Sequence, residues 1–139
     1  MKDPIFELQE AIYARLTGAT GVKYPVMDSI PDDFKKDFIE IQPVFSDYSP
    51  TGKKCPISIN IFNLYCWSLY DGNKKISQMF NDIGNVLTFS DSSTYTPLTT
   101  TNFNICGSYI QDKTINKLPE NEMFVRQGIM TIEIWTNEK

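Results

Sequence analysis

The residues that could carry chemistry in this chain are limited by one fact: it contains no histidine. Histidine is the commonest general acid–base residue, and it activates the nucleophile in Ser-His-Asp and Cys-His sites. It is also the commonest ligand of zinc and other transition metals. The cysteines, Cys55, Cys66 and Cys106, form no C-x-x-C pair of the kind that binds zinc or works in redox exchange. We therefore predict no enzymatic activity, no catalytic residue, no metal site and no cofactor.

Two other clusters share part of a known ligand pattern. Asp32 and Asp33, with Asp28 and Asp37 nearby, lack the alternating oxygen ligands, central glycine and closing Glu of a calcium loop. A solvated acidic loop or a helix cap is the favoured interpretation. The run Thr51–Lys54 contains Gly-Lys, but it lacks the full G-x-x-x-x-G-K-[ST] motif and leads into a strand pattern. It is better explained as a solvated loop or a contact with a partner.

Charge and hydropathy exclude several classes of protein. The net charge is −4 and the isoelectric point is about 4.8, which argues against a domain that grips nucleic acid. No apolar run approaches the roughly 20 residues that span a membrane, and the first residues lack the apolar core of a signal peptide. We expect synthesis in the cytoplasm, no membrane partner and three reduced cysteines. Cys66 and Cys106 lie in strand-like runs and are predicted to be buried.

The central stretch Cys55–Leu87 changes its apolar period once. Side chains alternate from Ile57 to Ile61 and the apolar run continues to Trp67, which predicts a long strand. After a break at Asp71-Gly72, apolar residues recur at spacings of three, four and seven, which predicts a helix able to cover a sheet. The predicted helix stripe consists of Ile76, Met79, Phe80, Ile83, Val86 and Leu87.

The remaining elements follow from similar patterns. A first helix over Asp3–Thr17 has a predicted buried stripe at Ile5, Leu8, Ile12 and Leu16, with Phe6 and Tyr13 beside it, and we expect all six residues to belong to the core. Strands are predicted around Lys23–Met27, over Phe38–Gln42 with a continuation past Pro43 to Tyr48, over Thr101–Ile110 and over Phe124–Trp135. The polar segments Ser46–Lys54 and Asp112–Glu122 are predicted as a hairpin loop and a connector.

These elements predict a single domain, residues 1–139, of the α+β class. The expected architecture is a two-layer sandwich: a mainly antiparallel sheet of four to five strands with both helices on one face. Ile61, Ile83 and Ile132 should be buried together. The opposite face would still carry Trp67 or Trp135 and Tyr65 or Tyr109, depending on register. An apolar face without a covering layer indicates a partner subunit.

The order of these patterns resembles the tail-completion, or tail-terminator, proteins of long-tailed bacteriophages. The resemblance covers almost the whole chain. It rests on the opening helix, the turn-rich stretch ending in Val26–Pro31, Phe38-Ile39-Glu40-Ile41, the strand end Trp67-Ser68 before Gly72 and the helix Lys74–Leu87, and the final Arg126–Ile132. Pro43 and the Thr-rich segment Asp91–Thr101 depart from the family pattern.

The resemblance implies a structural virion protein of the neck, at the top of the tail. Such proteins assemble as a homo-oligomeric ring of six subunits, or of twelve on a portal-type neck. The ring ends the tail tube and joins it to the head. Implied partners are the tail-tube protein, a head-completion, connector or portal protein, and DNA that passes through the lumen without sequence-specific binding. The alternatives are a small cytosolic ligand- or protein-binding module and, well below it, an enzyme using carboxylates and tyrosine.

Candidate interface residues follow from polar projections near strand ends. The hairpin loop and the connector are expected to reach neighbouring subunits or the tail tube, and Tyr48 is the predicted anchor because tyrosine is enriched at interfaces. The predicted interface residues are Asp47, Tyr48, Thr51, Lys53, Lys54, Asn116, Lys117 and Trp135.

Overall fold

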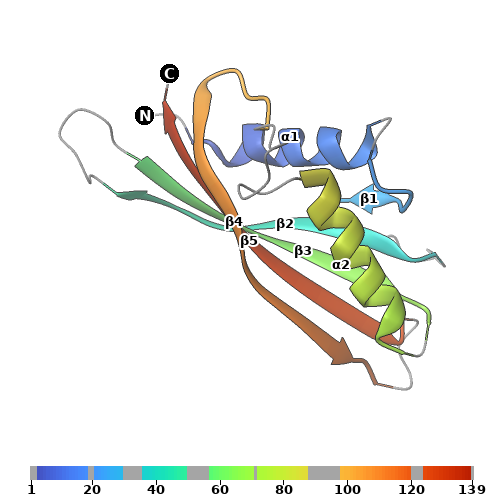
Figure 1. Ribbon diagram of the computed structural model, residues 1–139. Helices are drawn as coiled ribbons and strands as arrows, with labels where there is room; N and C mark the ends of the chain where they lie inside the picture. The colour runs from blue at the N-terminus through green and yellow to red at the C-terminus, as the bar shows by residue number, and fades with distance from the viewer. Residues whose placement is uncertain are drawn as a thin grey trace.

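The computed structural model shows one twisted sheet with two helices packed on the same face (Figure 1). It describes residues 3–18, 21–29, 36–49, 57–70, 72–87, 98–119 and 124–138, with the side chains of residues 45–49 left aside. The elements are α1 (Ile5–Thr17), β1 (Val26–Met27), β2 (Phe38–Ser49), β3 (Ile57–Ser68), α2 (Lys74–Leu87), β4 (Phe103–Lys117) and β5 (Arg126–Glu138). Within these ranges, no helix is long and apolar enough to cross a membrane.

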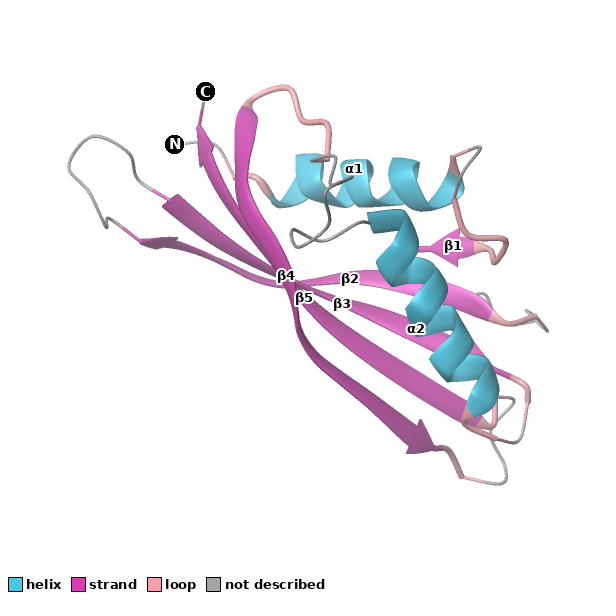
Figure 2. Ribbon diagram, viewed as in Figure 1, coloured by secondary structure: helices cyan, strands magenta, loops and turns pink. Residues whose placement is uncertain are grey.

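The sheet has the strand order β1-β2-β3-β5-β4 (Figure 2). β1 pairs with β2 in parallel, and the other three pairings are antiparallel. The predicted α+β class, with a mainly antiparallel sheet and two helices on one face, is confirmed. The register of β2 on β3 shifts between Pro43 and Phe45, so the strand continues past the proline through a bulge.

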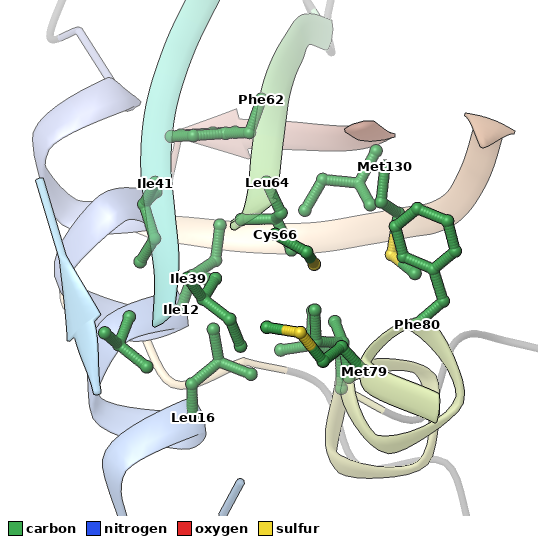
Figure 3. Packing of buried hydrophobic residues seen from close by; sticks show 14 of the residues in the cluster. Ile12, Leu16, Ile39, Ile41, Phe62, Leu64, Cys66, Met79, Phe80 and Met130 are labelled. Carbon is green, nitrogen blue, oxygen red and sulfur yellow. The ribbon is translucent and has the colours of Figure 1, made fainter. Parts of the chain in front are cut away.

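The core lies between the helices and the facing side of β2, β3 and β5 (Figure 3). α1 contributes Leu8, Ile12 and Leu16 at helical spacing, as predicted. The stripe of α2 is also confirmed, with Val86 only partly buried at its edge. The sheet supplies Ile39 and Ile41 from β2, Phe62, Leu64 and Cys66 from β3, and Met130, Ile132 and Ile134 from β5.

The expectation that Ile61 joins Ile83 and Ile132 in this core is wrong. β3 buries Ser58, Asn60, Phe62 and the later even-numbered residues, while Ile61 is only partly buried on the other face. Phe62 stands opposite Ile132, whereas Ile61 stands opposite Glu133. Because side chains alternate along a strand, one residue of phase decides the face.

Two segments predicted as loops begin as strands. β2 continues through Ser49, so Asp47 and Tyr48 pair with Ile59 and Ser58 of β3; this agrees with the predicted continuation to Tyr48 and contradicts a loop that begins at Ser46. The rest of that predicted loop lies outside the described residues. β4 continues through Lys117, where the sequence predicts a connector, and pairs along β5 as far as Arg126. The backbone ladder does not require apolar side chains, so polar strands of this kind carry no periodic signal.

Candidate assembly interface

The face of the sheet opposite the helices carries a line of apolar and aromatic residues. In register these are Ile57, Ile59, Ile61, Tyr65 and Trp67 of β3, Ile129 and Trp135 of β5, and Tyr109 of β4. The sequence predicts Trp67 or Trp135, and Tyr65 or Tyr109, on this side of the sheet. In the structure all four lie on it, and we call this side the open face. Among the described elements, neither helix covers it. Trp135 is 38% exposed and Tyr109 is 44% exposed, which makes them available for contact.

One end of the open face is closed by contacts within the chain. Phe38, Trp67 and Phe124 form a cluster in which the ring centroids are 5.3 to 6.2 Å apart. The Trp67 indole Nε1 donates a hydrogen bond of 3.3 Å to Glu40 Oε1. The indole N–H of Trp67 therefore has a hydrogen-bond acceptor within the chain, and the cluster buries Phe38 completely. We regard it as part of the fold.

The middle of the open face holds a buried carboxylate. Glu133 is 7% exposed and stands opposite Ile61 on one side and Tyr109 on the other. Within the described part of the chain, its Oε2 atom is buried and accepts no hydrogen bond. A buried acceptor without a donor is unfavourable, so water or a partner's donor is expected to complete it.

A second apolar surface lies along α1, where the core stripe was predicted to extend. Phe6 and Tyr13 are 69% and 49% exposed, so their assignment to the core is wrong. They wall a cavity of about 640 Å³, which we call the α1–β1 groove. Its lining is Phe6, Gln9, Glu10, Tyr13, Val26, Met27, Asp28, Ser29 and Ile41. The signal was the seven-residue spacing of Phe6 and Tyr13, which places them on one helix face.

The predicted interface residues lie in different parts of the fold. Asn116 and Lys117 are exposed at the end of β4, opposite Gln127 and Arg126. Trp135 pairs with Ile59 near the opposite end of β5, so the sheet register keeps it well apart from them. The backbones of Asp47 and Tyr48 are in β2, near its end. Thr51, Lys53 and Lys54 lie outside the described residues.

A polar cluster holds α2 against the segment before β1. The Tyr24 hydroxyl donates a hydrogen bond of 3.0 Å to Asp82 Oδ2. The Lys75 ammonium lies 4.9 Å from the centre of the Tyr24 ring and 3.9 Å from Asp37 Oδ2. Burial and the hydrogen bond to Asp82 raise the pKa of Tyr24 to about 12. This cluster is a structural clamp.

Neither cysteine in the described ranges lies in a reactive arrangement. Burial raises the pKa of the Cys66 thiol to about 12, so it stays protonated as a small apolar group. Cys106 is exposed, and the prediction that it is buried is wrong. Across the described residues, no three His, Cys, Asp or Glu side chains gather as a metal site would require.

A scan against protein-family models and a search of curated proteins both find no match. Among solved structures, the fold matches a chain of "Virion of native gene transfer agent (GTA) particle" with a TM-score of 0.73. The likeness extends over the whole of both chains. Sequence identity is 13%, so the comparison shows a shared fold.

Proposed function

We propose that this protein is a structural component of a phage-like virion. The observation that carries the proposal is the full-length fold match to a virion chain, which covers 100% of both chains. An incidental likeness of one motif would leave part of either chain unmatched. The open face and the α1–β1 groove supply the two apolar surfaces that an assembly subunit needs.

Within the virion, we propose that the protein forms the neck ring that ends the tail tube and joins tail to head. The sequence pattern resembles that of the tail-terminator family, and the structure has the order of helices and strands predicted from that pattern. The exposed Trp135 and Tyr109 are of the type enriched at protein interfaces. The tail-tube protein and a connector or portal protein are the partners we propose beside other copies of the chain.

The proposed ring surrounds the channel through which DNA passes. A net charge of −4 suits that position, because a surface of the same sign as the phosphate backbone does not hold DNA to the wall. The role is mechanical and needs no reacting residue.

Deleting the gene tests the ring function. Without a terminator, tails should grow to variable and excessive lengths and should fail to join heads, as seen by electron microscopy. Complementation with the wild-type gene should restore uniform, joined tails. A matched complementation with Thr51–Lys54 deleted should not, because we place this segment at a subunit contact. Uniform tails joined to heads in the complete deletion would rule out the terminator role.

A further inference from the structure

The α1–β1 groove has the features of a binding site for an extended polypeptide. Its walls are the exposed rings of Phe6 and Tyr13, and its floor is formed by the buried side chains of Val26 and Ile41. A volume of about 640 Å³ is large enough for several side chains. The apolar walls therefore offer more contact area than an isolated exposed aromatic residue would.

The groove also runs beside a sheet edge. β1 covers β2 only at Ile39 and Glu40, and from Ile41 onward β3 is the one sheet neighbour of β2 among the described strands. A strand edge of this kind presents backbone donors and acceptors to an incoming segment. The occupant is accordingly expected to be extended.

The charge of the groove selects a basic occupant. Glu10 and Asp28 are exposed at its rim, and none of the described residues that line it is Lys or Arg. A basic segment of this chain is available for the groove: Lys53 and Lys54 lie in a stretch, from Tyr48 to Asn60, that contains no acidic residue. By contrast, Lys75 is already in contact with Asp37 and Tyr24. The Lys35-Lys36 pair is flanked by Asp33 and Asp37.

We propose that the α1–β1 groove of one copy binds the β2–β3 connection, residues 50–56, of a second copy, with Lys53 and Lys54 beside Glu10 and Asp28. This inference rests on the proposed ring and names the contact that builds it. A chain cannot fill its own groove, because Ser49 lies about 26 Å along β2 from Ile41 and the strand continues past the N-terminal end of α1 (Figure 1). A contact between two different surfaces repeats head to tail and can close into a ring.

Disulfide trapping tests the contact, because Cys55 already lies within the proposed occupant. In a Cys106→Ser background, Tyr13→Cys or Phe6→Cys places a thiol on the groove wall. Mild oxidation of the concentrated, purified protein should give a ladder of linked dimers and larger multimers. Peptide mass spectrometry should find the new thiol joined to Cys55. Trapping accumulates even a short-lived contact, so a stable ring in solution is not required.

Two controls make the result specific. Ser77→Cys places a thiol on the exposed side of α2 and should give no ladder. Adding Cys55→Ser to the groove variants should abolish it. No ladder from either groove variant, or an equal ladder from Ser77→Cys, would overturn the proposal.

A charge exchange gives an independent readout. Glu10→Lys with Asp28→Lys, or Lys53→Glu with Lys54→Glu, should lower the trapping yield about fivefold, as loss of two exposed ion pairs implies. Combining all four substitutions should restore it. If the groove instead binds the tail-tube protein or a small ligand, the purified groove variants will give no ladder through Cys55, and the proposal is wrong. A ladder whose yield does not change on charge reversal would reject the pairing of Lys53 and Lys54 with Glu10 and Asp28. A ladder from a protein absent from virions would reject only the virion function, whereas a virion protein without a ladder would reject only this contact.

Discussion

Replacing Gly128 with alanine should destabilise the protein, because α2 packs against β5 at this residue. Gly128 stands opposite Cys66 of β3 and Ile115 of β4, on the side of the sheet that faces the helices. A Cβ atom added there would lie 2.4 Å from Ile76 Cγ2 and 2.7 Å from Phe80 Cζ. Both distances are well inside van der Waals contact, so the helix or its side chains must move.

The magnitude follows from how little room those side chains have. Ile76 is fully buried and Phe80 is 6% exposed, so neither ring nor methyl group can turn into solvent. Overpacking of a close-packed core costs about 1–3 kcal/mol. For a chain of this length, each kcal/mol shifts the melting temperature by about 4 °C. Gly128→Ala should therefore melt roughly 4–12 °C below the wild type.

Gly84→Ala is the matched control, since it makes the same chemical change in α2, where no described atom outside the adjoining helix backbone lies within 4 Å of the new Cβ. Alanine is favoured over glycine inside a helix by about 0.5–1 kcal/mol, so this variant should melt at or above the wild-type temperature. Calorimetry and urea unfolding with an unchanged m-value would measure both effects. A Gly128→Ala variant as stable as Gly84→Ala would refute the close packing of α2 on β5.

Three further predictions concern burial. Ile83→Ala should lose on the order of 2–5 kcal/mol in urea unfolding, while Ile61→Ala on the open face should lose clearly less; the reverse order would contradict the assignment of faces. In folded Cys55→Ser protein, a thiol reagent should modify Cys106 quickly and Cys66 only after unfolding. Because the pKa of Tyr24 is about 12 when folded and near 10 when unfolded, its contribution is complete below pH 10 and lost as the pH rises toward 12. The unfolding free energy should thus fall more steeply over that range than in Tyr24→Phe, and parallel curves would argue against the clamp.

The sequence predicts the long middle strand and α2 well, because their apolar side chains repeat with a clear period. It does not predict which face of β3 is buried. Every odd-numbered residue of β3 except Asn63 is apolar or aromatic, while the even-numbered side is apolar at Phe62, Leu64 and Cys66, so both faces carry apolar residues. The helices pack on the side with Phe62, Leu64 and Cys66, and that choice is made by tertiary packing.

β4 shows a different limit of pattern reasoning. Its register against β5 shifts between Ile105 and Gly107 and again between Ile110 and Asp112. The first shift leaves Phe103 facing the helices and Tyr109 on the open face, although both lie at odd positions of one apparent alternation. A bulge inserts one residue and reverses the phase. Gly107 borders the first shift, and a glycine inside a strand pattern is one sign of a bulge, but the second shift, between Ile110 and Asp112, has no such residue.

The candidate interface was predicted in part. Two helices cover only one face of the sheet, while the strand patterns place apolar residues on both faces, so the sequence predicts an uncovered aromatic face. Trp135 lies on that face and is 38% exposed. The α1–β1 groove was missed, because Phe6 and Tyr13 were assigned to a wider core stripe. An amphipathic helix predicts its buried centre reliably, but aromatic residues at the stripe edge are decided by what packs beside them. The roles of the eight predicted interface residues remain predictions.

The most direct test is a cryo-electron microscopy reconstruction of the neck of the virion that the same genome encodes. The proposed function predicts a closed ring of subunits with this five-stranded sheet and two helices, seated between the last ring of the tail tube and the head. Neck density fully accounted for by other chains, with no subunit of this fold, would contradict it.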